Sequence, residues 1–192
     1  MVPRIFRSGS AAKCVVAVLF ILLTNTVVNG SYTAGDCVVS CAVATIGEKE
    51  IKENRSPFID DCNRLTGVAL GSPWCASVAA MWYSQCGLMS PMSAYSPDWF
   101  KSDECVYIRG KIDEKIKPGD TGGIYFPSKK RIAHLFLVES VDGQWLRTIE
   151  GNTSDAKSGT EADRNGDRVM RKKRLKSKVE RISRHWDGQK NN

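Results

Sequence analysis

The sequence has few of the residues on which several common function classes depend. Among its 192 residues there are two histidines, His134 and His185, and aromatic side chains make up 8%. It has neither zinc-finger spacing nor an aromatic-rich RNA-binding motif, so we expect no nucleic-acid partner. It also lacks repeats and low-complexity tracts. With 42% hydrophobic and 26% charged residues it differs from disordered chains and collagen-like rods, and its length suits one compact domain with accessory segments.

The sequence also has no apolar run long enough for an ordinary membrane span. Its longest candidate, Cys14–Leu23, is about half of the roughly 20 residues that a spanning helix needs. Three basic residues precede this run, and the small residues Val28 and Gly30 follow it, which is the layout of a secretory signal. We therefore expect residues 1–30 to be a signal peptide. The mature protein is then secreted or periplasmic, and it contacts the membrane only if this segment stays uncleaved.

Positive charge is concentrated near the end of the chain. The formal net charge is +7, and Arg168–Arg184 alone carries nine basic residues and one acidic residue. The rest of the chain after residue 30 has a net charge of −4. A basic segment on an acidic body can contact an anionic polymer such as cell wall, or it can be the solvated face of a final strand.

The order of the elements predicts an α+β domain at residues 45–187, between a linker at 31–44 and a tail at 188–192. Residues 46–65 are expected to contain a first helical region, and Gly87–Lys117 is expected to be irregular, with a short helix near residues 98–100. A series of strands follows. The expected strands begin at Ile124 and cover Ile132–Glu139, Gln144–Glu150 and Val169–Val179.

The clearest local pattern is a helix that begins close to Cys75. Ser72 suits the N-cap, Pro73 suits the first helical position, and Gly87 suits the left-handed residue after the last turn. Cys75 then lies in the first turn, where open backbone N–H groups stabilise a thiolate. This feature alone is as compatible with a buried structural cysteine as with a nucleophilic thiol, and His134 decides between the two.

His134 lies within a predicted central strand, and the following hairpin determines its neighbours. With Val141–Gly143 as a three-residue loop, His134 lies directly opposite Glu150, and Asn152 lies diagonally beside it. A two-residue loop would shift the register by one and turn Glu150 to the other face. The three-residue turn therefore predicts that Glu150 holds the imidazole, which in turn maintains the Cys75 thiolate.

Several motifs in this order resemble the CHAP-type amidases and peptidases of the NlpC/P60 papain-like group, which are peptidoglycan hydrolases. They are Pro73-Trp74-Cys75-Ala76, Lys117-Pro118-Gly119-Asp120, Ala133-His134, Thr148-Ile149-Glu150-Gly151-Asn152-Thr153 and Arg171-Lys172-Lys173-Arg174. The resemblance spans roughly residues 46–186. It implies a papain-like fold in which N-terminal helices, including the nucleophile helix, pack on an antiparallel sheet.

The same resemblance implies roles for individual residues. Cys75 is the nucleophile, His134 the base, Glu150 the orienting residue and Asn152 an accessory polar group, and we expect the neighbouring Trp74 to contact substrate. The implied reaction cleaves an amide bond of peptidoglycan, either next to muramic acid or within the stem peptide. The alternatives are a cysteine protease or toxin acting on a protein, and a catalytically inactive wall-binding module.

We expect neither a cofactor nor a metal site. The acids at 163–167 alternate like the start of a calcium loop, but Arg174 occupies the position of the closing glutamate. Cys37 and Cys41 form only half of a metal-ligand pattern. Six cysteines follow the signal segment, and a catalytic Cys75 leaves five, so at most two disulfides form within the chain. We expect Cys37 or Cys41 to remain, either free or bridging two chains.

Overall fold

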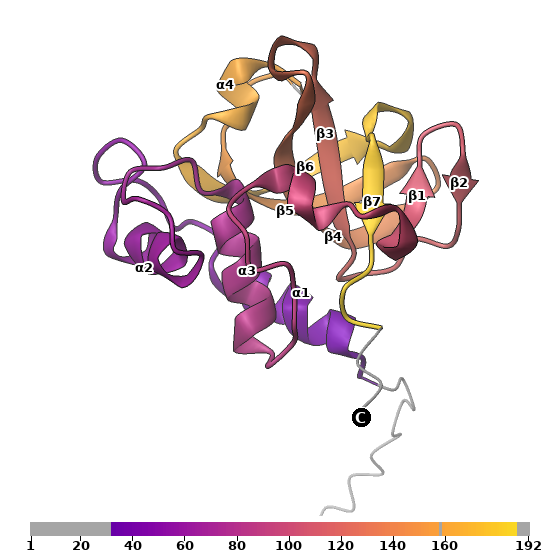
Figure 1. The fold of residues 1–192 in the computed structure, drawn as a ribbon, viewed down its shortest axis with the longest axis horizontal. Coiled ribbons are helices and arrows are strands. Elements are labelled where there is room, and N and C mark those ends of the chain that lie inside the picture. Colours follow the sequence, from indigo (N-terminus) through magenta and orange to yellow (C-terminus); the bar gives the residue numbers. More distant parts are fainter. Residues whose placement is uncertain (1–31, 158, 188–192) are drawn as a thin grey trace, which may run out of the picture. The chain divides into compact units, whose positions relative to one another are not determined.

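The computed structural model describes residues 32–157 and 159–187, so the predicted signal peptide at 1–30 and the tail at 188–192 lie outside the described residues. In the described part the chain is α+β, with helices set against an antiparallel sheet (Figure 1). Its α-helices are α1 (Ala34–Ala44), α2 (Pro57–Leu65), α3 (Cys75–Gln85) and α4 (Glu161–Arg164). A search of these residues for a helix of sufficient length and apolarity to cross a membrane finds none.

Seven strands form one antiparallel sheet in the order β2-β1-β7-β3-β4-β5-β6. They are β1 (Cys105–Ile108), β2 (Ile112–Asp113), β3 (Thr121–Phe126), β4 (Arg131–Asp142), β5 (Trp145–Thr153), β6 (Arg168–Leu175) and β7 (Arg181–Ser183). The expected α+β class is confirmed, and the helix that begins at Cys75 packs on an antiparallel sheet. The strands β1 and β2 fall in the segment that was expected to be irregular.

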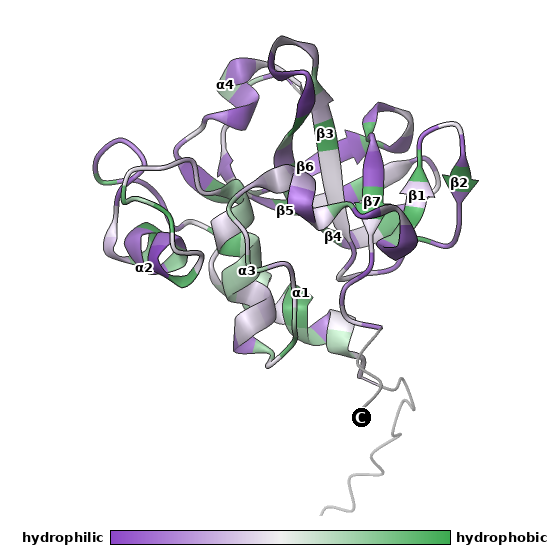
Figure 2. Cartoon of the chain, in the orientation of Figure 1, coloured by the Kyte–Doolittle hydropathy of each residue, from purple (hydrophilic) through white to green (hydrophobic). Residues whose placement is uncertain are grey.

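Each face of the sheet has its own hydrophobic core. Leu135, Leu137 and Ile149 face α1, α2 and α3, whereas Phe136 and Val138 belong to the core of the opposite face. This alternation follows from the period of two in a strand that is covered on both sides. Figure 2 shows the composition of α3, which is white to green over much of its length, and most of its residues are buried.

The expected linker at 31–44 is wrong, because most of it is helix α1. Thr33 caps this helix and forms a reciprocal capping box with Asp36, which satisfies two backbone N–H groups at the helix start. Val38 and Ala42 are fully buried in the core shared with α3. Gly35 shows how closely α1 approaches its neighbours, because a Cβ atom built there would lie 2.5 Å from Pro118 O.

The ends of the other helices differ in part from those expected. In the first helical region only Pro57–Leu65 is helical, with Ser56 as its cap, and the short helix near residue 98 is a 3-10 turn, Ser96–Trp99. The helix α3 starts at Cys75 with Trp74 at the N-cap, so the expected cap at Ser72 is wrong. Gly87 has the predicted left-handed backbone, with φ of 65°.

One disulfide joins α1 to the end of α3 in the described residues. It links Cys37 to Cys86, while Cys41, Cys62, Cys75 and Cys105 are free thiols. Cys37 is therefore paired within the chain, and of the two cysteines considered for a bridge to a second chain only Cys41 keeps its thiol.

Candidate active site

Cys75 is the first residue of α3, so it lies in the first turn as the sequence predicted, although the helix begins two residues later than expected. Trp74 at the N-cap offers no side-chain oxygen, so no side chain caps the N–H groups of the first turn. The thiol is buried, with 5% of the residue exposed, and its Sγ lies 3.8 Å from Ser96 Oγ. The helix start thus provides polar N–H groups beside a thiol that is shielded from water.

The imidazole of His134, on β4, interacts with this thiol, and Glu150, on β5, holds the imidazole. The imidazole is fully buried, and its Nε2 lies 2.8 Å from Glu150 Oε2. Its other nitrogen, Nδ1, has no hydrogen-bond partner among the described residues. Because Nε2 binds the carboxylate, Nδ1 is the nitrogen left to exchange a proton with Cys75.

The hairpin that brings Glu150 to His134 does so by a different turn from the one predicted. Asp142 pairs with Trp145, so the turn is Gly143-Gln144, and this register alone would turn Glu150 away from His134. A bulge at Glu139 adds one residue to β4, so that Leu137 pairs with Ile149. This shift of one residue returns Glu150 to the face of the sheet that carries His134. The predicted contact therefore forms through a shorter turn and a bulge.

The electrostatics of the site favour an ion pair between the thiolate and the imidazolium. Burial opposes charge on His134, but its interactions with Cys75 and Glu150 outweigh burial and raise its pKa to about 9. Burial also opposes ionisation of Cys75. Interactions with His134, with Ser96 and with the backbone N–H of Leu135 outweigh it and lower the pKa of the thiol. The charge on each of the two groups therefore favours the charge on the other.

Glu150 is kept ionised by a buried arginine that the sequence analysis did not identify. Burial alone would raise the pKa of Glu150, but Arg174 and His134 lower it well below its usual value. Arg174 Nε lies 2.8 Å from Oε1, Arg174 Nη2 binds Oε2, and Thr148 Oγ1 donates to Oε1 at 2.5 Å. With the bond from His134, the Glu150 carboxylate has four contacts, and all of them come from side chains of residues that are at most 2% exposed.

Beyond Arg174, further ion pairs connect β6 to Asp163 on the short helix α4. Arg174 Nη1 lies 2.8 Å from Asp163 Oδ2, and Lys172 Nζ binds the other oxygen of Asp163. Since Lys172 and Arg174 are two residues apart on β6, both side chains point to the same face of the sheet. The basic run of the sequence is thus partly internal, because two of its members neutralise buried acids.

Two residues expected in the site lie elsewhere. The Trp74 ring is fully buried and its indole N–H donates to Glu50 Oε1 at 3.0 Å, so the expected contact with substrate is wrong. Asn152 has a left-handed backbone, with φ of 55°, and its Nδ2 donates to Asn54 Oδ1 and to Gly166 O. It fastens the loop before β6 and makes no hydrogen bond to His134, so its expected role beside the imidazole is wrong.

The glycine between Glu150 and Asn152 has a steric role. A Cβ atom built on Gly151 would lie 2.4 Å from Val78 Cγ1 and 2.7 Å from the Trp74 ring. Any side chain there would push α3 away from β5. Gly151 thus allows the nucleophile helix to approach the strand that carries Glu150.

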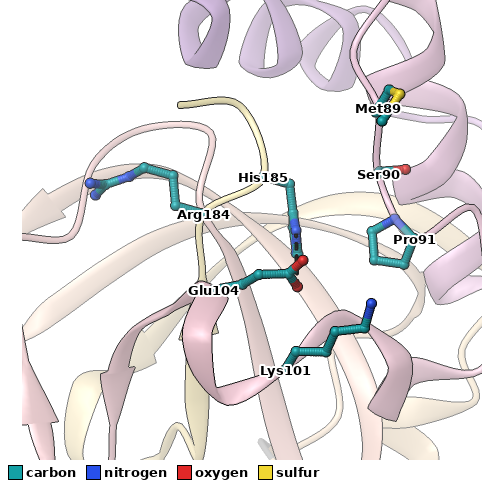
Figure 3. A pocket seen from close by; sticks show the side chains of 7 residues that line it. All are labelled: Met89, Ser90, Pro91, Lys101, Glu104, Arg184 and His185. Atoms are coloured by element: carbon teal, nitrogen blue, oxygen red, sulfur yellow. Dashed lines mark ion pairs between the residues drawn. The ribbon is translucent and has the colours of Figure 1, made fainter. Parts of the chain in front are cut away.

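The second histidine belongs to a different part of the molecule. His185 lines a cavity of about 300 Å³ together with Met89, Glu104 and Arg184 (Figure 3). Its Nε2 lies 3.1 Å from Trp99 O. None of the residues that line this cavity contributes to the cluster around Cys75.

The described residues therefore bring together Cys75, His134 and Glu150 as predicted. They add Ser96, Arg174 and Asp163, to which the sequence patterns assigned no role in the site. One signal could have identified Arg174. It lies directly opposite the buried Leu146 in the β5–β6 pair, so its side chain is on the same, buried face of the sheet. Comparison of the chain with protein-family models, with curated proteins and with solved structures finds no match.

Proposed function

We propose that the protein is a secreted or periplasmic cysteine hydrolase of the papain-like NlpC/P60 type that cleaves an amide bond of peptidoglycan. The observation that carries the proposal is the buried imidazole of His134, held at 2.8 Å by an ionised Glu150 and paired with a thiol at a helix start. The choice of peptidoglycan rests on the resemblance of the sequence motifs. The Cys37–Cys86 disulfide is compatible with an oxidising compartment.

The proposed reaction begins with the Cys75 thiolate. Its sulfur attacks the amide carbonyl carbon, and the negative charge moves to the carbonyl oxygen, which the first-turn N–H groups of α3 receive. The imidazolium of His134 gives its proton to the leaving amine, so the C–N bond breaks and a thioester remains on Cys75. Glu150 holds the ring in place throughout.

Water then completes the cycle. Neutral His134 takes a proton from a water molecule as that water attacks the thioester carbon. The carbon–sulfur bond breaks, the acid product leaves, and the thiolate and imidazolium are restored. Because Cys75 is 5% exposed and Ser96 Oγ lies 3.8 Å from its sulfur, little of the nucleophile's surface is open to a substrate carbonyl.

The test is digestion of purified peptidoglycan with residues 31–192 and with two single variants. Cys75→Ala removes the nucleophile, and Cys105→Ala is the matched control because Cys105 is an equally buried free thiol on β1. Mass spectrometry of the products identifies the newly freed amine. We expect activity in the parent chain and in Cys105→Ala and none in Cys75→Ala.

Two results would overturn the proposal. Equal product from the parent and from Cys75→Ala would refute the thiol mechanism. No product from any folded variant would refute hydrolysis of peptidoglycan, and binding to the same material without cleavage would then favour the inactive wall-binding module.

A further inference from the structure

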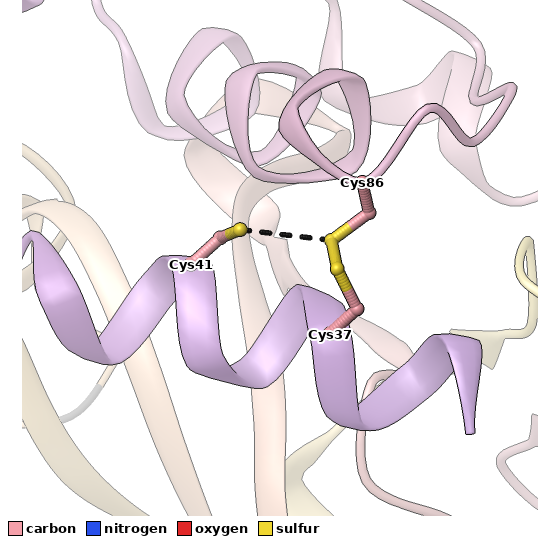
Figure 4. Close-up of side chains that lie close together, drawn as sticks. All are labelled: Cys37, Cys41 and Cys86. Carbon is pink, nitrogen blue, oxygen red and sulfur yellow. Dashed lines mark hydrogen bonds between the residues drawn. A yellow bond between two sulfur atoms is a disulfide. The ribbon is translucent and has the colours of Figure 1, made fainter. Parts of the chain in front are cut away.

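Three cysteine sulfurs gather where α1 crosses the end of α3, away from Cys75 (Figure 4). Cys37 and Cys41 lie one turn apart on α1, and Cys86 is the C-cap residue of α3. Cys37 and Cys86 form the disulfide, and the Cys41 thiol lies 3.6 Å from Cys86 Sγ. All three sulfurs lie within 4.8 Å of one another, so Cys86 is within reach of two partners.

The packing of α1 against α3 fixes this arrangement. Residues four positions apart share one face of a helix, so Cys37 and Cys41 both face α3. Val38 and Ala42, which neighbour them on α1, are fully buried in the core that includes Val78 and Ala79 of α3. Since a disulfide is about 2.05 Å long, side-chain rotation that moves the sulfurs by about 1.5 Å is enough to join Cys41 to Cys86.

The two cysteines of α1 differ in how readily they carry negative charge. Cys37 is closer to the helix N-terminus, where the backbone N–H groups favour a thiolate. Burial raises the pKa of the Cys41 thiol. Cys37 is therefore the better leaving group, and Cys41 attacks only after it has lost its proton.

We propose that Cys37, Cys41 and Cys86 form a thiol–disulfide exchange site, in which Cys86 pairs alternately with Cys37 and with Cys41. Cys41 gives its proton to water, and the thiolate attacks Cys86 Sγ to form a new sulfur–sulfur bond. The Cys37–Cys86 bond breaks, and its electron pair leaves on Cys37, which takes a proton from water. One disulfide and one thiol are present before and after, so the step uses neither an oxidant nor a reductant.

The exchange changes which thiol is free without releasing α1. Both disulfides tie the same helix to the same end of α3, so the core between them stays closed. The free thiol moves from Cys41 to Cys37, nearer the start of α1. This exchange involves none of the groups around Cys75 and does not depend on the proposed hydrolase function.

The first test maps the free thiols of the unreduced wild-type chain. Protein is equilibrated near about pH 5 and near about pH 9, on either side of the ordinary thiol pKa, and is then quenched with acid. Free thiols are blocked with N-ethylmaleimide, and tryptic peptides are sequenced by mass spectrometry. Cys37 and Cys41 share one tryptic peptide, and fragment ions across Val38–Ser40 distinguish them. We expect maleimide on Cys37 to rise several-fold at the higher pH.

Three variants make the test specific. Cys37→Ser is expected to form a Cys41–Cys86 disulfide, and Cys86→Ser is expected to leave both thiols of α1 free. Cys41→Ser is the matched control, in which Cys37 should stay unlabelled at every pH.

The proposal is overturned if Cys41 carries all the label of α1 at both pH values in the wild-type chain. It is also overturned if folded Cys37→Ser keeps Cys41 and Cys86 as free thiols under oxidising conditions. If Cys37→Ser does not fold, the wild-type map alone decides.

Discussion

The side chains of both histidines are largely shielded from water, with 0% of His134 and 4% of His185 exposed, yet their surroundings move their pKa values in opposite directions. The pKa of His134 is raised to about 9, whereas burial, together with the positive charge of Lys101, lowers that of His185 to about 4. The His134 ring meets an ionised carboxylate at 2.8 Å. The nearest carboxylate oxygen to His185 lies 3.7 Å from Nδ1, and the hydrogen bond of its Nε2 goes to a backbone carbonyl.

The comparison separates the effect of burial from the effect of partners. Removal from water disfavours a charged imidazole at both sites. Only His134 has the two negative partners, the Cys75 thiolate and Glu150, that reverse this effect, and Glu150 is itself held ionised by Arg174. Burial alone therefore does not mark a candidate for proton transfer. His134 is the better candidate of the two because charged partners raise its pKa.

The largest expected effect comes from replacing each histidine with glutamine. We expect His134→Gln to lower the rate of amide hydrolysis by about 10³-fold or more, because it removes the proton donor and the partner of the thiolate. We expect His185→Gln to stay active, since a glutamine amide can still donate to Trp99 O. Product release from peptidoglycan measures both rates, and an equal loss in both variants would contradict the distinction.

A second measurement tests the same pair without a substrate. The rate at which iodoacetamide alkylates Cys75 reports the thiolate. In the parent chain and in His185→Gln we expect this rate to reach its plateau below the ordinary thiol pKa, because His134 lowers the pKa of Cys75. In His134→Gln the rise should move to higher pH.

Arg174→Met should have the next largest effect, on stability. It leaves Glu150 and Asp163 buried without their shared cation, and we expect the free energy of unfolding to fall by about 3–5 kcal/mol. Arg171→Met is the matched control on the same strand, since its ion pair with Glu139 is exposed and contributes about 0–1 kcal/mol. Urea unfolding measures both, and similar losses would contradict the role of the buried chain.

The part of this site that was predictable from the sequence is the part set by local chemistry. A helix that begins close to Cys75, a histidine in a central strand and an acidic residue on the same face of the hairpin were predicted from local residue patterns and strand parity, although the N-cap is Trp74 and not Ser72. The hairpin turn did not follow, because Asp142-Gly143 suggests a turn one residue too early and the bulge at Glu139 has no sequence signal. The correct contact was thus predicted from an incorrect register.

Other features could not be predicted because they depend on distant contacts. Arg174 and Lys172 belong to a run of basic residues that resembles a solvated face, and only the approach of α4 makes them internal. Likewise, the small residues of α1 look like a tether until the helix packs on α3. For Trp74 the error is in the opposite direction. A tryptophan next to a candidate nucleophile suggested a contact with substrate, but its ring is buried in the core.

His185 should make the protein sensitive to acid in a way that His134 does not. Its folded pKa of about 4 lies below the value of 6.5 expected when unfolded, so the unfolded chain binds the proton first as pH falls. The stability that depends on neutral His185 is present above about pH 6.5 and is lost as the pH falls toward 4, by on the order of 3 kcal/mol. Urea unfolding across this range should show a shallower loss in His185→Gln, and parallel curves would contradict the assignment.

The smallest effect concerns Ser96, whose hydroxyl lies 3.8 Å from the Cys75 sulfur. Because this contact helps to lower the pKa of the thiol, Ser96→Ala should move the alkylation curve to higher pH and reduce hydrolysis by about 10-fold. Ser93→Ala is the control on the same segment, since its hydroxyl binds Asp98 and not the thiol. Similar curves and rates for the two variants would mean that Ser96 only shapes its segment. A difference between them would show that the Ser96 hydroxyl itself supports the Cys75 thiolate.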